Sequence, residues 1–372
     1  MAEHQQKKKW RHSRNMPTLL NNGYMIRIIP NSWLKDSGSD ELVALHYFFN
    51  KTIPERALIE FAARVCYNST ARLGTAPNFV ENVLEKGHLS VAEHPAFFIK
   101  APTHISSGGY RRPFIQKFEW LTLHELNRFN EFNQKAIFSN VRSLTETFNE
   151  SKTNMGRLVS STLHPLLPRF FELTEWKAVE DLTPANIYVP GTQDVQLLAF
   201  NPGSTVDAKY TGLKETKSGT TRNWSRYTFL IECSRNCSLQ IARHRGASIS
   251  QESQRYVDAK HNRGFVYPPD ISEYQSNVLR EWYEDSLDKY EYLRSIGFTK
   301  EDARFVLPGA IKTRMVISFN YMEFLHFCKM RVDKHAQWEI RDIATEMLRQ
   351  AILITDEKKG RKLHELAEAR LS

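Results

Sequence analysis

The chain has 372 residues, of which 41% are hydrophobic and 25% are charged, and its formal net charge is +9. This composition is typical of a globular protein with a buried core, and it excludes a disordered or low-complexity chain. No apolar run is long enough to cross a bilayer, so we expect no membrane-spanning helix. The positive charge favours anionic ligands, but its spread along the chain speaks against a nucleic-acid surface.

Residues 1–15 are polar and basic, and they lack the apolar middle of a signal peptide. We expect a solvated tail here, with a nucleic-acid-contacting or targeting tail as the alternative. The cysteines show no spacing typical of a zinc site, and we expect four free thiols in a reducing compartment, which favours the cytoplasm. These cysteines are Cys66, Cys233, Cys237 and Cys328.

Apolar periodicity predicts two helices early in the chain, at 58–70 and at 78–86, the second ended by Gly87. A strand-like apolar run follows at 96–99. Residues 121–150 have apolar side chains near helical spacing, which predicts a long helix. Prolines interrupt residues 164–190, and residues 202–220 are rich in Gly, Ser, Thr and Lys, which predicts a loop.

The second half of the chain has clearer patterns. A strand is predicted at 227–232, and Ser234 is placed to cap a helix that runs to about His244. Helices are predicted at 273–296, 299–305, 321–331 and 335–354, and a strand rich in β-branched residues at 314–320. No repeat with a solenoid period is evident.

The most polar stretch is 243–256, which contains three arginines, one histidine and three serines. Few of its residues suit a core, and it follows a helix with an apolar face. On that helix Gln240, Arg243 and His244 share a face because they are three and four residues apart. This pattern indicates a site for an anion with polar ring edges, such as a nucleotide.

The run Arg243-His244-Arg245, followed by Ser253, resembles the signature of the flavin-dependent thymidylate synthases. Further blocks resemble that family in the right order, at 88–94, 234–240, 303–308, 320–321 and 330–340. The resemblance covers roughly 58–96 and 227–354. With the basic tail set at 1–25, the resemblance implies a catalytic domain made of 26–100 and 227–372 and an insertion at 101–226.

The join between the two halves of that domain is ambiguous. Residues 96–100 and 227–232 are each suited to supply the strand before the helix that leads to Arg243. Residues 97–112 also resemble a degraded copy of 229–245. A partial duplication is the less favoured explanation of that similarity.

The resemblance implies an α+β fold with a mixed, largely antiparallel sheet flanked by helices, and a mainly helical inserted subdomain. It implies a homotetramer that converts dUMP to dTMP, with methylenetetrahydrofolate as carbon donor, reduced FAD as hydride donor and NADPH as reductant. Two alternatives stay open. One is an enzyme with another product or substrate, such as a flavin-dependent pyrimidine nucleotide hydroxymethylase, and the other is a non-catalytic nucleic-acid-binding relative.

The resemblance also implies residue roles. Arg331 is the expected catalytic residue, because a fixed cation beside the uracil favours its N3-deprotonated form; the alternative is an arginine that closes a helix. The expected dUMP contacts are Gln240, Arg243, Gln251, Glu252, Ser253, Gln254, Arg255 and Arg304. The expected FAD contacts are His88, Ser90, Arg243, His244, Arg245, Gln251, Asn320 and His326. No metal site is expected.

Three side chains carry competing interpretations. Ser253 is expected to hold the nucleotide, because a serine nucleophile needs an adjacent base. The histidines at 88 and 94 are alternatively residues at turns, with backbone groups as their partners. Tyr256 is suited either to stacking on a base or to anchoring the core.

Overall fold

The structure is a computed structural model that describes residues 25–26, 54–76, 78–100, 136–140, 142, 192, 194–201, 225–259, 264–358 and 360–371. The chain divides into two compact units. One comprises residues 1–23, 95–183 and 203–220, and the other comprises 24–94, 184–202 and 221–372. Nearly all of the predicted tail and most of the predicted insertion lie outside the described residues.

The first unit contains a two-stranded antiparallel sheet. Strand β2 (Ala96–Lys100) pairs with β3 (Ala136–Asn140) along its whole length. The helix predicted over 121–150 is therefore wrong at 136–140. A short apolar run fits both the helical and the strand periodicity, and here the pairing with β2 stabilises the strand. The proline-interrupted stretch 164–190 and the predicted loop 202–220 lie outside the described residues.

The second unit is built on a five-stranded sheet with the order β1-β4-β5-β7-β6. Its strands are β1 (Met25–Ile26), β4 (Val195–Asn201), β5 (Arg226–Ser234), β6 (Ser248–Gln251) and β7 (Lys312–Asn320). Each pairing in this sheet is antiparallel. The α+β class is thus confirmed, with a sheet that is antiparallel rather than mixed in the part of the chain described here.

Strand β4 departs from the predicted division of the chain. It lies inside the range 101–226 predicted as an insertion, yet it pairs with β5 from Val195 opposite Ile231 to Asn201 opposite Arg226. Helix α16 (Trp338–Ile352) holds it through Gln350, whose side chain accepts from the amide of Leu197 and donates to the carbonyl of Val195. The sheet of the second unit therefore includes a strand that the sequence analysis assigned elsewhere.

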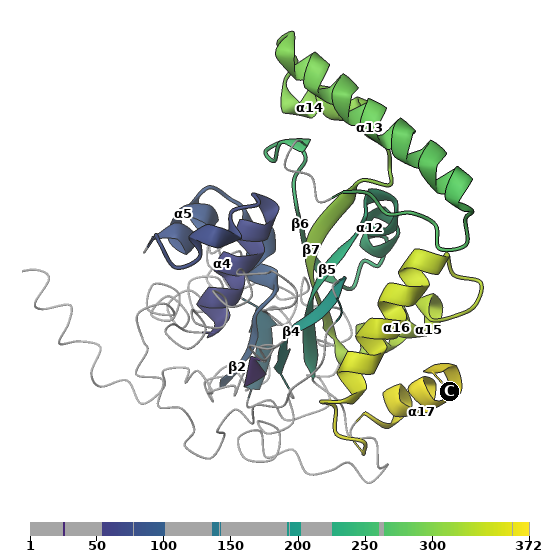
Figure 1. The fold of residues 1–372 in the computed structure, drawn as a ribbon. Helices are drawn as coiled ribbons and strands as arrows, with labels where there is room; N and C mark the ends of the chain where they lie inside the picture. The colour runs from purple at the N-terminus through teal and green to yellow at the C-terminus, as the bar shows by residue number, and fades with distance from the viewer. Residues whose placement is uncertain are drawn as a thin grey trace, which may run out of the picture. The chain divides into compact units, whose positions relative to one another are not determined.

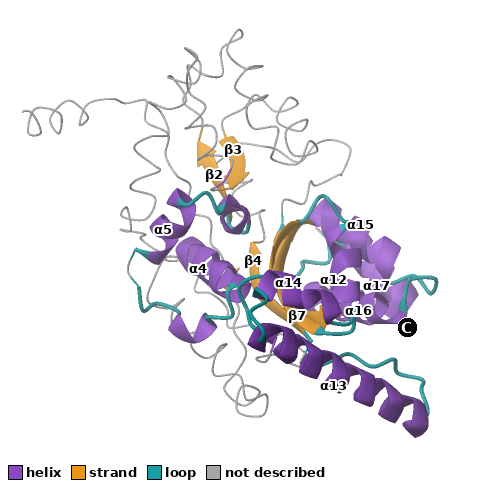
Figure 2. Cartoon of the chain, turned by 90° about the horizontal axis from the view of Figure 1, so that it is seen from above, coloured by secondary structure: helices purple, strands orange, loops and turns teal. Residues whose placement is uncertain are grey.

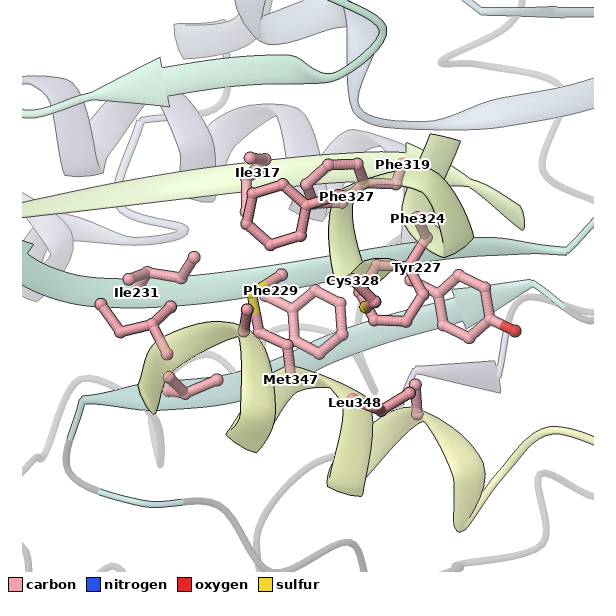
Figure 3. Packing of buried hydrophobic residues seen from close by; sticks show 14 of the residues in the cluster. Tyr227, Phe229, Ile231, Ile317, Phe319, Phe324, Phe327, Cys328, Met347 and Leu348 are labelled. Carbon is pink, nitrogen blue, oxygen red and sulfur yellow. The ribbon is translucent and has the colours of Figure 1, made fainter. Parts of the chain in front are cut away.

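One face of the sheet packs against α12 (Arg235–Ala242), α15 (Tyr321–Arg331) and α16, and α17 (Arg361–Leu371) packs on α15 and α16. Alternate residues of β5 and β7 point into this layer, because successive side chains of a strand face opposite sides. Figure 3 shows Phe229 and Phe319 of these strands packed with Phe324 and Phe327 of α15; all four are fully buried. This layer is the main hydrophobic core.

The other face of the sheet is covered by α4 (Pro54–Cys66), which contacts β6 and β7, and by the short 3-10 helix η3 (Leu89–Glu93), which contacts β6. Helix α4 buries Leu58, Phe61 and Val65. Two short helices, η2 (Thr70–Arg72) and α5 (Phe79–Glu85), lie between α4 and η3 in the chain. Figure 1 and Figure 2 show the sheet between α4 on one side and α15 to α17 on the other.

A long helix, α13 (Glu273–Ser295), extends past the sheet and is followed by α14 (Lys300–Ala303) and η7 (Arg304–Val306) (Figure 1). Ser272 and Gln275 form a reciprocal capping box at the start of α13. Several of its aromatic side chains are exposed, including Trp282 at 69%. Among the described helices, none is long and apolar enough to span a membrane.

Candidate active site

Helix α12 leads into the polar segment 243–256, and a buried contact fixes where the helix begins. Ser234 caps it as predicted, accepting from the amide of Cys237 at 3.0 Å. The amide and hydroxyl of Ser234 also donate to the two carboxylate oxygens of buried Glu339, each at 2.6 Å. The start of α12 is therefore tied to the start of α16, which sets the direction in which Arg243 emerges.

Arg331 is the last residue of α15 and lies beside α12. Its Nη2 donates to the carbonyl oxygen of Gln240 at 3.4 Å, which joins two predicted site residues. This contact is also what an arginine near helix ends makes, since backbone carbonyls there lack intrahelical donors. The contact holds the guanidinium next to the helix that leads to Arg243.

His244 follows α12 and packs into a ring of aromatic side chains. Its ring centroid lies 5.5 Å from Phe319, 5.7 Å from His326 and 5.6 Å from Phe327. Its Nε2 lies 3.1 Å from the carboxylate of Glu323. The structure therefore brings the two predicted flavin contacts His244 and His326 together, and it adds an acidic partner.

Glu323 is a site residue that the sequence analysis missed. A Cβ at Gly246 would lie 2.2 Å from its carboxylate oxygen, so the glycine after the Arg-His-Arg run leaves room for the carboxylate in this position. Asn320, a predicted flavin contact, caps α15 by accepting from the amide of Glu323 at 2.8 Å. The spacing Asn320 to Glu323 matches a helix start with an acid in the first turn, a signal that was present in the sequence.

Gln251 ends β6, and its side chain has two hydroxyl partners. Its Nε2 donates to the hydroxyl of Ser238 at 2.7 Å and to that of Thr313 at 3.3 Å. The Ser238 hydroxyl in turn donates to the carbonyl of Arg235. A glutamate at this position would have no proton to donate, so the neutral amide suits the neighbours that this chain provides.

The segment after β6 is anchored by its backbone. The amide of Glu252 donates to the carbonyl of Arg314 and that of Ser253 to the carbonyl of Cys66, each at 2.9 Å. The Glu252 carboxylate lies 3.7 Å from the Nε of Arg314, whose guanidinium is buried. The predicted nucleotide residues 252–255 are thus fixed to β7 and to the end of α4.

Aromatic side chains adjoin this segment. The ring of Tyr67 lies 5.3 Å from that of Tyr256 and 6.3 Å from that of His88, centroid to centroid. Tyr256 is 52% exposed, so it does not anchor the core. Tyr67 was not predicted, because a tyrosine at a helix end carries no distinctive pattern. His88 lies on the surface, and so does Ser90 in η3.

Two of the predicted dUMP-binding arginines are connected to the α14–η7 region. The Nη1 of Arg255 lies 3.8 Å from the carboxylate of Glu301, and the Nε of Arg304 donates to the carbonyl of the same residue. Burial lowers the pKa of Arg235, and the positive charge of Arg304 lowers it further. Arg235 is the first residue of α12, so the structure brings two cations, Arg235 and Arg304, together at the start of this helix. Such an arrangement suits an anionic ligand.

The remaining predicted residues lie at the surface or are half-buried. Arg243 and Arg245 are exposed on either side of His244, and Gln254 is half-buried in the anchored segment. Within the described ranges, no three His, Cys, Asp or Glu side chains converge as metal ligands.

All four cysteines are described, and none is in a disulfide. Burial raises the pKa of Cys66 to about 11, and it raises the pKa of Cys328 well above the usual range. A hydrogen bond with Cys237, together with burial, does the same for Cys233. Cys237 is itself buried in the core. The raised values at 66, 233 and 328 favour neutral thiols, and the thiolate is the nucleophilic form of cysteine.

The chain was compared with known proteins. Residues 194–354 match the family model described as "Thymidylate synthase complementing protein". Three similar proteins, each named "Flavin-dependent thymidylate synthase", come from Pyrococcus horikoshii, Geobacter sulfurreducens and Thermococcus onnurineus. They are 44%, 44% and 41% identical over 129, 128 and 131 residues, about a third of this chain in each case. The matches cover 53%, 55% and 52% of those proteins, so the chain spans about half their length.

Proposed function

Since residues 194–354 match the model of the thymidylate synthase complementing protein family, we propose that this protein is a flavin-dependent thymidylate synthase. It methylates dUMP to dTMP, with methylenetetrahydrofolate as the carbon donor. The observation that carries the proposal is the contact of Arg331 with Gln240. It holds a cation of α15 against α12, the helix that leads into the Arg-His-Arg run of the signature.

The residues present fit a flavin cofactor. FAD carries a diphosphate, and Arg243 and Arg245 offer two exposed cations that are separated in sequence by one residue. His244 lies between them in an aromatic cluster, where its ring is suited to contact a flat cofactor ring. We assign the FAD contacts to these three residues with His88, Ser90, Gln251, Asn320 and His326. Reduced FAD, when bound, supplies the hydride, and NADPH is the proposed source of its electrons.

The chain must also activate uracil C5, which is a poor nucleophile. The ordinary synthase adds a cysteine to C6, but the raised thiol pKa values at 66, 233 and 328 and the full burial of Cys237 do not suit that role. A fixed guanidinium offers another route. Arg331 beside the uracil stabilises the N3-deprotonated form and so raises the electron density at C5, and a preorganised charge needs no reorganisation during the reaction.

Ser253 is assigned to holding the nucleotide together with the other predicted dUMP contacts. Its amide donates a hydrogen bond to the carbonyl of Cys66, and its hydroxyl accepts one from the amide of Arg255. A nucleophilic serine needs a base, and the nearest candidate in sequence, His244, has its Nε2 next to Glu323 instead. The arginines at 243, 255 and 304 suit the nucleotide phosphate.

A homotetramer is part of the proposal. Trp282 of α13 and Phe305 of η7 are 69% and 82% exposed, and large exposed apolar groups of this kind suit a subunit interface. Arg304 lies next to Phe305, so an interface there would bring this arginine to a neighbouring subunit's site. Light scattering of the purified protein measures the assembly.

The test of the function is a flavin spectrum followed by turnover. The purified protein should be yellow, and it should oxidise NADPH faster when dUMP is present. Mass spectrometry of the nucleotide product should find dTMP. A hydroxymethylated product would identify the protein as a hydroxymethylase instead of a methylating enzyme. A protein that binds no FAD would contradict the proposal. Steeply salt-dependent binding of DNA or RNA without flavin would favour the nucleic-acid-binding alternative.

A further inference from the structure

A row of hydroxyl groups crosses the face of the sheet that lies opposite the main core. Thr228 of β5 pairs with Ser318 of β7, and Ser248 of β6 pairs with the same serine. Their neighbours along the strands, such as Phe229 and Phe319, point into the core, so these three residues face the other way. A row of hydroxyls beneath a covering layer needs hydrogen-bond partners there.

The partner is His94, which follows η3 and is fully buried. Its Nδ1 lies 2.9 Å from the hydroxyl of Ser318, and its Nε2 lies 2.8 Å from the hydroxyl of Ser250. The hydroxyl of Thr228 lies 2.7 Å from that of Ser318. Hydroxyls both donate and accept, so a neutral imidazole is satisfied in either tautomer. His94 therefore contacts side chains of β7 and β6, not the backbone groups expected from its place in a turn.

The backbone around His94 also accepts hydrogen bonds from a side chain of the sheet. Arg226 donates from its Nε to the carbonyl of His94 at 2.9 Å, and from its Nη2 to the carbonyl of Glu93 at 2.6 Å. The same Nη2 donates to the hydroxyl of Ser248 at 3.0 Å. Because Arg226 is itself nearly buried in β5, it fixes His94 to the centre of the sheet.

Strand β6 is short and lies at the edge of the sheet. It has four residues, and within the described residues it pairs with β7 alone, at the end of the strand order. The next residues along the chain are Glu252 and Ser253. A short strand with one neighbour has few backbone hydrogen bonds to fix its position, so a side-chain contact at Ser250 has a large share in holding it.

We propose that His94 is a positioning residue that holds β6 through Ser250 and thereby places the segment 252–255 to bind the nucleotide. The inference rests on the proposed function in one respect, namely that this segment binds dUMP. His94 touches neither the nucleotide nor the cofactor; it acts through Ser250. The chain thus uses the histidine of its Glu93-His94 pair to lock the nucleotide segment to the rest of the sheet.

Two substitutions separate the two ring contacts. Asparagine places its amide near the position of Nδ1, so His94→Asn keeps a partner for Ser318 and removes the one for Ser250. Glutamine reaches the position of Nε2, so His94→Gln keeps the partner for Ser250. We expect His94→Asn to raise the KM for dUMP about tenfold with kcat changed less than about twofold, the effect of one lost hydrogen bond. His94→Gln should stay within about threefold of the unaltered protein.

Ser250→Ala removes the same contact from the other side and is the less disruptive change. It also removes the hydrogen bond between Ser250 and the Cys66 side chain, so it should raise the KM for dUMP at least as much as His94→Asn does. The double variant should be no worse than Ser250→Ala alone, because that variant already lacks the interaction that the two residues share. Ser318→Ala is the matched control at the other ring nitrogen, and it should leave the KM within about twofold. Equal effects of asparagine and glutamine, additive effects in the double variant, or a loss in kcat alone would overturn the inference.

Hydrogen exchange tests the positioning without any activity. His94→Asn and Ser250→Ala should speed exchange of the amides of Glu252 and Ser253 by about tenfold, while the amides of β5 keep their rates. Unchanged exchange at these two amides contradicts the positioning role. If the unaltered protein makes no dTMP but exchange responds as expected, the proposed function fails and the positioning of the segment stands.

Discussion

The two faces of the five-stranded sheet are built from different chemistry. Toward α12, α15 and α16 the strands bury Phe229 and Phe319 among other apolar side chains, and the contacts there are non-directional. Toward α4 and η3 the same strands present Thr228 and Ser318, which are joined to His94 by hydrogen bonds. Burial of apolar area supplies most of the stability of a fold, whereas directional hydrogen bonds fix where a segment lies.

The predicted site residues follow this division. His244 and Arg331 are attached to the helices of the apolar layer, while Ser253 and its neighbours are attached to β6 and the end of α4. The helices of the apolar layer therefore carry the proposed activating charge. The polar face carries the proposed nucleotide contacts of residues 252–255. Changes on the two sides should therefore have different signatures.

The largest effect is expected in the apolar layer. Phe229→Ala removes a fully buried ring that stacks 5.5 Å from Phe324, and it should lower the free energy of unfolding by about 3–5 kcal/mol. Chemical denaturation measures the change. Leu353→Ala, at a side chain that is 54% exposed, is the control and should cost less than about 0.5 kcal/mol. Equal costs would mean that this layer is not the core.

The next effect is on chemistry and concerns Arg331. Arg331→Ala should abolish measurable methylation, with a loss in kcat of about 10²–10³-fold or more, because a preorganised charge is removed. The flavin spectrum and the melting temperature should stay close to those of the unaltered protein. Arg331→Lys keeps the charge but not the planar geometry, and should recover part of the rate. Loss of FAD in the alanine variant would assign the residue to cofactor binding instead.

The third effect distinguishes the polar face by its response to acid. Burial, and to a smaller extent the charge of Arg226, lowers the pKa of His94 to about 3 from the ordinary value of 6.5. Below pH 6.5 the unfolded chain binds a proton that the folded chain refuses, so stability falls as the pH falls toward 3. The expected slope is about 1.4 kcal/mol per pH unit from this group.

Denaturation between pH 6.5 and pH 4 measures that slope. His94→Gln cannot titrate and serves as the control, so its stability should fall by about 2–3 kcal/mol less over this range. Identical slopes for the two proteins would show that the imidazole is charged in the folded state or is not buried.

The smallest effect is expected at the nucleotide segment itself. Ser253→Ala should raise the KM for dUMP by about fivefold to tenfold, the value of about one hydrogen bond, and leave measurable turnover. Steady-state kinetics with dUMP as the varied substrate measures both quantities. A variant that binds dUMP normally but does not turn over would require a nucleophilic role for this serine.

Local patterns predicted several elements closely. The cap at Ser234, the strand that ends at Asn320 and the helix that ends at Arg331 agree with their predicted positions, because each is marked by a capping residue or a clear period. Strands β1, β3, β4 and β6 were not predicted, since a few apolar or polar residues fit more than one structure. Helix α17, of eleven residues, was not predicted either.

The candidate site shows the same limit. The predicted residues near Arg243 could be found because they follow one another in sequence and match a family pattern. Glu323, Tyr67 and Ser238 are separated from that run or carry no pattern, and only the packing of α15, α4 and α12 brings them to it. A single sequence contains no signal for a contact between segments far apart in the chain.

The sequence by itself determined the polar segment 243–256, because that segment depends on residue type and local spacing. It determined the class of fold through the resemblance of its motifs to those of a known family. Only the tertiary structure decided what His94 and Glu323 contact and that β4 joins the sheet. It also decided which face of the sheet is covered by the apolar core and which by the polar contacts of His94. Those outcomes depend on strand register and on which helix covers which face. Register and layer order are set by the summed burial of the whole domain, not by any one segment.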